Sequence, residues 1–132
     1  MSSILNYATE ILLLVFLIIT FVQSGIDKVI NWQGNLDWLK GHFAKTPLKK
    51  IVPLLLVIVL ITEVISGVLC LLGVYQILTM ADVTLARYGA IFSCIALLML
   101  LFGQRMAQDY EGAKTIAIYF IPAIFLVYML QP

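Results

Sequence analysis

Four apolar segments divide this chain, and each is long enough to cross a lipid bilayer. They run over residues 5–25, 51–74, 85–103 and 113–130. A transmembrane helix needs roughly 20 mostly apolar residues, because the hydrocarbon core of a bilayer is roughly 30 Å thick. The sequence therefore predicts an all-α fold, an antiparallel bundle of four transmembrane helices that forms a single domain over residues 1–132.

The composition excludes an ordinary water-soluble domain. Of the 132 residues, 63% are hydrophobic and 11% are charged, and the mean hydropathy is +1.08. Soluble domains carry about 25% charged residues. The net charge of +1 gives no electrostatic reason to expect a nucleic-acid partner. The partner that the composition implies is the lipid bilayer.

The connection over residues 26–50 is the only long one. Within it, Trp32, Leu36, Leu39 and Phe43 recur at helical spacing, with polar residues between them. This pattern is typical of a short amphipathic helix. Such a helix would either lie on the membrane surface or cap the bundle, and the pattern favours neither. The other connections, over residues 75–84 and 104–112, are expected to be short loops.

Basic residues are distributed unequally between the two sides of the predicted bundle. With four spans, residues 26–50 and 104–112 share one side, and only Arg87 belongs to the other. Because basic residues favour the cytoplasmic side, we expect a multi-pass protein of the bacterial inner membrane with both termini outside the cytoplasm. The basic residues of the predicted cytoplasmic side are Lys28, Lys40, Lys45, Lys49, Lys50, Arg105 and Lys114.

Glu63 is the most unusual residue of the predicted spans. It is the thirteenth of 24 residues in the second segment, which places it near the membrane midplane. An ionised carboxylate there costs several kcal/mol unless it is paired or reached by water. It would serve either as a proton-accepting or ligand-anchoring group in a cavity, or as a protonated or hydrogen-bonded group that fixes helix packing. The predicted polar pocket consists of Glu63, Gln23, Ser24 and Tyr119.

Small residues follow Glu63 at spacings of three and four. A stripe of this kind lets helix backbones approach closely in a membrane. Glu63 is therefore expected to point into the bundle and away from lipid. The predicted helix-packing residues are Gly25 on the first helix and Ser66, Gly67, Cys70 and Gly73 on the second.

Charged residues gather where the first and third helices end on the predicted cytoplasmic side. Asp27, Lys28, Arg105 and Asp109 would form a network without net charge. Charged residues at helix ends also extend routinely into the interface without any site. Interfacial capping and a pocket shared with Glu63 both remain open.

The cysteines and the single histidine give no sign of a metal site. Cys70 and Cys94 lie 24 residues apart in apolar runs, with no C-x-x-C motif. His42 has no evident partner in the sequence. Because metal sites need three or four suitably spaced ligands, none is predicted. Both cysteines are interpreted as packing residues.

Two motifs resemble the signatures of the DoxX family. The first is the Gly25-Ile26-Asp27-Lys28 sequence after the first helix. The second is the glutamate-containing run from Glu63 through Ser66-Gly67 to Leu71-Leu72-Gly73. The chain's size and its four segments also match this family, so the resemblance covers nearly the whole chain.

The resemblance implies a small four-helix membrane protein, not catalytic by itself, that is an accessory subunit of a quinone- or thiol-linked oxidoreductase. A quinone is the cofactor that this would involve, and other membrane, periplasmic or cytoplasmic subunits would be the partners. The absence of a C-x-x-C motif argues against direct thiol–disulfide exchange. The alternative is a non-catalytic structural or assembly subunit of a larger membrane complex. A small-molecule or proton carrier is less favoured, because no inverted repeat is visible.

Overall fold

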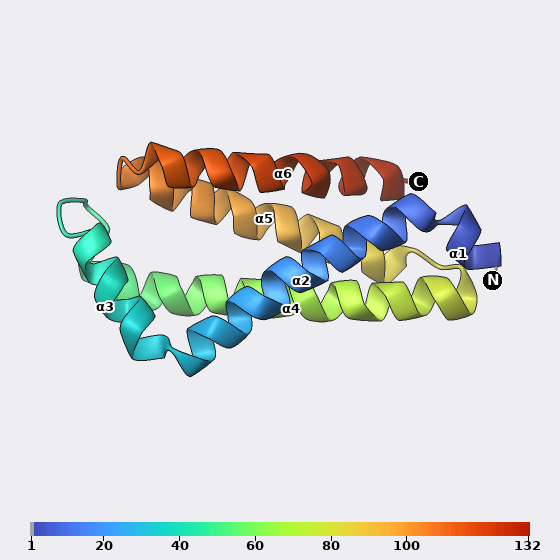
Figure 1. Ribbon diagram of the computed structural model, residues 1–132, viewed down its shortest axis with the longest axis horizontal. Helices are drawn as coiled ribbons and strands as arrows, with labels where there is room; N and C mark the ends of the chain where they lie inside the picture. The colour runs from blue at the N-terminus through green and yellow to red at the C-terminus, as the bar shows by residue number, and fades with distance from the viewer. Residues whose placement is uncertain (1) are drawn as a thin grey trace.

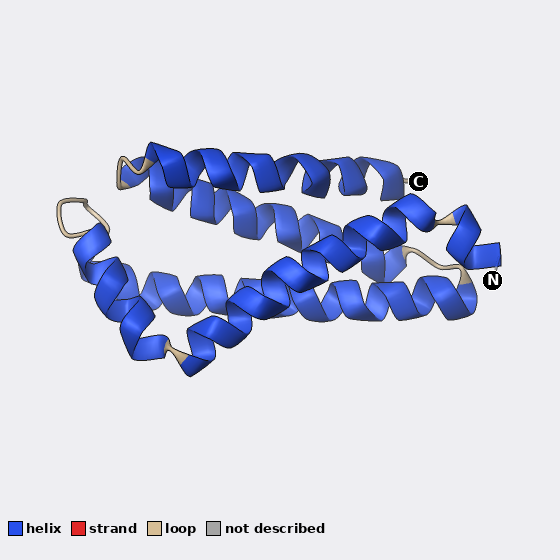
Figure 2. Cartoon of the chain, in the orientation of Figure 1, coloured by secondary structure: helices blue, strands red, loops and turns tan. Residues whose placement is uncertain are grey.

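The computed structural model describes the backbone of residues 2–132 and the side chains from Ile4 onward, and the described residues form helices joined by short loops (Figure 2). The bounds of the long helices are α2 Ala8–Ile30, α4 Val52–Met80, α5 Thr84–Met106 and α6 Tyr110–Leu130. The short ones are α1 Ser2–Asn6, α3 Trp32–His42 and the 3-10 helix η1 Lys49–Ile51. The predicted all-α fold, with a short helix in the first connection, is confirmed.

The four long helices form a ring in which sequence neighbours pack side by side. Helix α4 packs against α2 and α5, α5 packs against α6, and α6 returns to contact α2. Neighbouring helices run in opposite directions (Figure 1). Short loops join α4 to α5 and α5 to α6, whereas the longer connection from α2 to α4 contains α3 and η1. All four are long and apolar enough to cross a membrane. The chain is therefore a multi-pass integral membrane protein with four spans.

Helix α4 extends farther than the expected boundary at residue 74. It continues to Met80, and the loop before α5 is only residues 81–83, whereas residues 75–84 were expected to form a loop. The reason is local: no glycine or proline interrupts the chain between Val74 and Met80. The helix ends where Ala81 adopts a left-handed conformation with φ 52°. Helix α2 also runs past its expected end, to Ile30.

Small residues allow α4 and α5 to pack closely. A methyl group on Gly73 would lie 2.6 Å from Ala86 Cα, and one on Gly89 would lie 2.9 Å from the Cys70 backbone nitrogen. Such distances leave no space for a side chain, so backbone packs directly against backbone. Cys70 and Cys94 are buried in this region as free thiols.

Candidate intramembrane site

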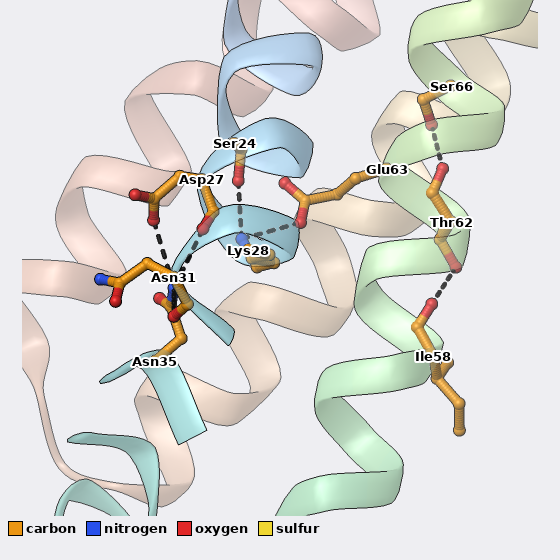
Figure 3. Close-up of polar contacts among 9 residues, drawn as sticks. All are labelled: Ser24, Asp27, Lys28, Asn31, Asn35, Ile58, Thr62, Glu63 and Ser66. Carbon is orange, nitrogen blue, oxygen red and sulfur yellow. Dashed lines mark hydrogen bonds and ion pairs between the residues drawn. The ribbon is translucent and has the colours of Figure 1, made fainter. Parts of the chain in front are cut away.

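Glu63 forms an ion pair with Lys28 between α4 and α2. Lys28 Nζ lies 2.9 Å from Glu63 Oε1, and Nζ also donates a hydrogen bond of 2.6 Å to Ser24 Oγ. Figure 3 shows the Glu63 side chain reaching from α4 toward the last turns of α2. Only 2% of the Glu63 side chain is exposed. An acid that a membrane interior would otherwise exclude is thus paired with a cation.

The contact between the two charges is electrostatic and not a well-aligned hydrogen bond. Glu63 Oε1 is fully buried and, among residues 2–132, has no partner with hydrogen-bond geometry. The Lys28 side chain is 16% exposed, so it is the more accessible of the two side chains.

The pair lies in the half of the bundle that contains α3. Glu63 follows Val52, the first residue of α4, by eleven positions and precedes Met80 by seventeen. At 1.5 Å per residue these are roughly 16 and 26 Å. The expected midplane position assumed a helix that ends at residue 74. The extension of α4 to Met80 places Glu63 closer to the end where α4 begins.

The predicted polar pocket is only partly assembled. Ser24 joins Glu63 through Lys28. Gln23 is exposed and lines neither of the two cavities described below. Tyr119, on α6, packs its ring edge-on against Phe16 with the ring centroids 6.1 Å apart. These two residues therefore lie outside the contacts around Glu63.

The structure divides the four predicted network charges between two places. Lys28 pairs with Glu63, while an oxygen of Asp27 accepts a hydrogen bond of 3.3 Å from Asn35 Nδ2. Arg105 lies over the ring of Tyr110, 4.8 Å from its centroid, and Asp109 accepts a hydrogen bond from the Gly112 backbone nitrogen. Among residues 2–132, no ion pair joins one of the four to another.

His42 has partners that the sequence did not reveal. Its Nε2 lies 2.8 Å from Gln104 Oε1 and 3.7 Å from Asp109 Oδ2. Its ring stacks on Trp38, with centroids 4.5 Å apart. The sequence did not indicate this partner because Gln104 lies 62 positions away in the chain. His42 attaches the end of α3 to the connection between α5 and α6.

The residues predicted for helix packing are buried on α4 and α2. Ser66, Gly67, Cys70 and Gly73 are all buried along one side of α4. Gly25 is buried on α2, and a methyl group there would make an ordinary contact of 3.6 Å with Val64. A groove of about 390 Å³ lies between these two helices, and its lining includes Gly25, Gly67 and the buried Glu63.

A larger cavity of about 550 Å³ lies among α3, α4 and α5. Its walls are apolar except for Lys28, Asn35 and Gln104, with the indole of Trp38 as a further amphipathic group. Val59 lines the end near Lys28, and Phe43 and Leu48 line the opposite end. Helix α3 therefore forms one side of this space through Asn35, Trp38 and Leu39.

The described residues give no metal centre. Residues 2–132 contain no group of three or more His, Cys, Asp or Glu side chains arranged to hold an ion. The chemically distinctive feature is therefore the buried ion pair beside the apolar cavity. Sequence reasoning identified Glu63 but did not identify Lys28 as its partner. A basic residue close to the end of the first apolar segment was the available signal.

Comparison with known proteins places the chain in one family. No curated protein and no solved structure matches it. The DoxX family matches residues 11–103, which include both residues of the ion pair and all of α4 and α3. This match spans more than half of the chain, and the chain belongs to the DoxX family.

Proposed function

We propose that the protein is a small membrane subunit of a redox complex and that it binds a quinone in the cavity among α3, α4 and α5. The observation that carries this proposal is the lysine at one end of the cavity. The Lys28 ammonium has three N–H donors. Ser24 accepts a hydrogen bond from one of them, and Glu63 Oε1 lies 2.9 Å from the nitrogen without hydrogen-bond geometry. At least one donor is therefore left for an oxygen of a ligand.

The cavity has the chemical character that a quinone requires. A site for such a molecule is mostly apolar, with a few polar groups that fix the ring. The cavity of about 550 Å³ has apolar walls and contains Lys28 and Asn35 as donors. In this proposal Lys28 donates a hydrogen bond to a ring oxygen, and Glu63 holds the ammonium in place and balances its charge.

The electrons for quinone chemistry would come from a partner oxidoreductase. This chain would supply the lipid-facing site and the oriented donor, and it is not proposed to be catalytic alone. A thiol-linked partner is also compatible, but Cys70 and Cys94 are both buried between helices. Thiol exchange would therefore belong to the partner protein.

Quinone binding in lipid nanodiscs tests the proposal. The probe is a short-chain ubiquinone with a photoreactive tail, and the readout is the labelled peptide. We expect labelling of α4 or α5 beside the cavity, and loss of that labelling in Val59→Trp, which fills the end near Lys28. Val57→Trp is the matched control, because Val57 is exposed on the same helix and lines neither cavity.

Purification from native membranes tests the complex. Mild detergent extraction followed by mass spectrometry should recover an oxidoreductase subunit together with quinone. A complex of fixed composition that lacks redox proteins, together with unchanged labelling in Val59→Trp, would support the alternative of a structural or assembly subunit. That result would contradict the quinone proposal.

A further inference from the structure

The connection between α3 and α4 carries an unbalanced positive charge. Its lysines, Lys45, Lys49 and Lys50, are all exposed. No acidic residue occurs between Asp37 and Glu63. Within residues 2–132, none of the three lysines forms an ion pair. We call these three residues the lysine cluster.

The lysine cluster lies at one end of the apolar cavity. Leu48 lines the cavity and is followed directly by Lys49 and Lys50, which begin η1. Phe43 lines the same end and precedes Lys45 by two positions. Figure 1 shows this connection as the loop beyond α3, at the end of the bundle where α4 begins and α5 ends. Charged and apolar binding surfaces therefore adjoin at one place.

The length of the cavity corresponds to one leaflet of a bilayer. Along α5 its lining extends from Ile95 to Gln104, a span of nine residues. This corresponds to roughly 13 Å at 1.5 Å per residue. Half of a hydrocarbon core is roughly 15 Å. The cavity therefore has the length of an acyl chain in the leaflet next to the lysine cluster.

We propose that the cavity and the lysine cluster together form a binding site for an anionic phospholipid. One acyl chain enters past Leu48 and Phe43 and lies against α4 and α5, while the phosphate binds Lys45, Lys49 and Lys50. Clusters of lysines next to a transmembrane helix attract anionic headgroups. A zwitterionic lipid has no net charge to match the lysine cluster. An acidic protein could bind the lysines but has no acyl chain to fill the cavity.

This site has a consequence for the function proposed above. An acyl chain and a quinone would occupy overlapping space, so the lipid would be a resting occupant that a quinone displaces. Only this competition depends on the proposed function. The lipid site itself is measured without quinone, so its failure and the failure of quinone binding are distinguishable.

The test is lipid retention by the full chain, measured with native mass spectrometry. The protein is purified from nanodiscs that contain equal parts of phosphatidylglycerol and phosphatidylcholine. We expect retention of about one phosphatidylglycerol with a preference of about tenfold, a size that a few lysine–headgroup contacts supply. K45Q/K49Q/K50Q should remove the preference, and Leu55→Trp, which fills the cavity, should remove retention. Lys114→Gln, at the start of α6, is the control and should behave as the wild type.

Two outcomes would overturn the proposal. The first is that the wild type shows no preference for phosphatidylglycerol. The second is that the lysine variant loses the preference while Leu55→Trp retains the lipid fully, which would indicate headgroup attraction at the membrane surface only. If Leu55→Trp does not fold, judged by its thermal midpoint, Met99→Trp fills the same cavity from α5 and replaces it in the test.

Discussion

Lys28 Nζ and Glu63 Oε1 lie 2.9 Å apart, although only 2% of the Glu63 side chain is exposed. The two residues come from antiparallel helices, so the pair fixes the register of α2 against α4. A buried ion pair adds little net stability, because removing two charges from water costs about as much as their attraction returns. Its presence is therefore better explained by specificity of packing or by ligand binding.

Removal of one partner should be far more damaging than removal of both. Lys28→Met leaves an uncompensated carboxylate between α2 and α4, and we expect a loss of roughly 3–5 kcal/mol in the free energy of unfolding. Lys28→Met/Glu63→Leu should recover most of this loss. Unfolding in mixed micelles measures both values. Equal stability of the single and double variants would show that the two charges are not coupled.

An exposed ion pair provides the control for that comparison. Lys114 and Glu111 lie 3.8 Å apart with 67% and 90% of their side chains exposed. Such pairs contribute at most about 1 kcal/mol. Lys114→Met should therefore leave the free energy of unfolding nearly unchanged.

Two glycines in helices should respond to alanine in opposite ways. Gly73→Ala places a methyl group 2.6 Å from Ala86 Cα, so α4 and α5 must separate and the thermal midpoint should fall. Gly41 in α3 has nothing within 4 Å of the added carbon. There, alanine should be neutral or stabilise by about 0.5–1 kcal/mol through helix propensity. Equal effects at both positions would contradict the close packing of α4 on α5.

The spans were predictable because they depend on local hydrophobicity, and so was the burial of Glu63, which depends on its position in the second span. The partner of Glu63 was not predictable in the same way. The expected network grouped Lys28 with Arg105 and Asp109 because all three lie at helix ends. The actual contact depends on how far α2 and α4 extend and on how they cross. The contact between His42 and Gln104 is likewise set by tertiary packing.

The stability of the turn between α4 and α5 should depend on pH through Asp82. Hydrogen bonds from the Thr84 hydroxyl and backbone N–H lower the pKa of Asp82 below its ordinary value. A lowered folded-state pKa stabilises the turn above the unfolded pKa, and this stabilisation is lost as the pH falls through the folded pKa. Thr84→Ala should raise the pKa of Asp82, measured by carboxyl NMR titration. An unchanged titration would show that the hydroxyl hydrogen bond does not lower the pKa of Asp82.

The orientation in the membrane remains a prediction from the charge asymmetry. Lys49 and Lys50 lie just before α4, and Lys114 lies near the start of α6. Both helices start at the same end of the bundle (Figure 1). The positive-inside rule then places both termini outside the cytoplasm. A cysteine added at either terminus should react with an impermeant maleimide in intact cells. Reaction only after lysis would show that the termini lie in the cytoplasm, contrary to this prediction.

His42 should control how firmly α3 covers the cavity. Helix α3, Trp32–His42, contains no buried residue, so little apolar packing holds it in place. His42 Nε2 faces two oxygens, Gln104 Oε1 at 2.8 Å and Asp109 Oδ2 at 3.7 Å. His42→Ala removes both contacts and the stacking on Trp38. Hydrogen exchange should therefore accelerate across α3 while the centre of α4 stays protected.

Lys40→Ala, an exposed change on the same helix, should leave exchange unaltered. A uniform acceleration in α3 and α4 together would show that His42 stabilises the whole bundle and does not specifically hold the cover.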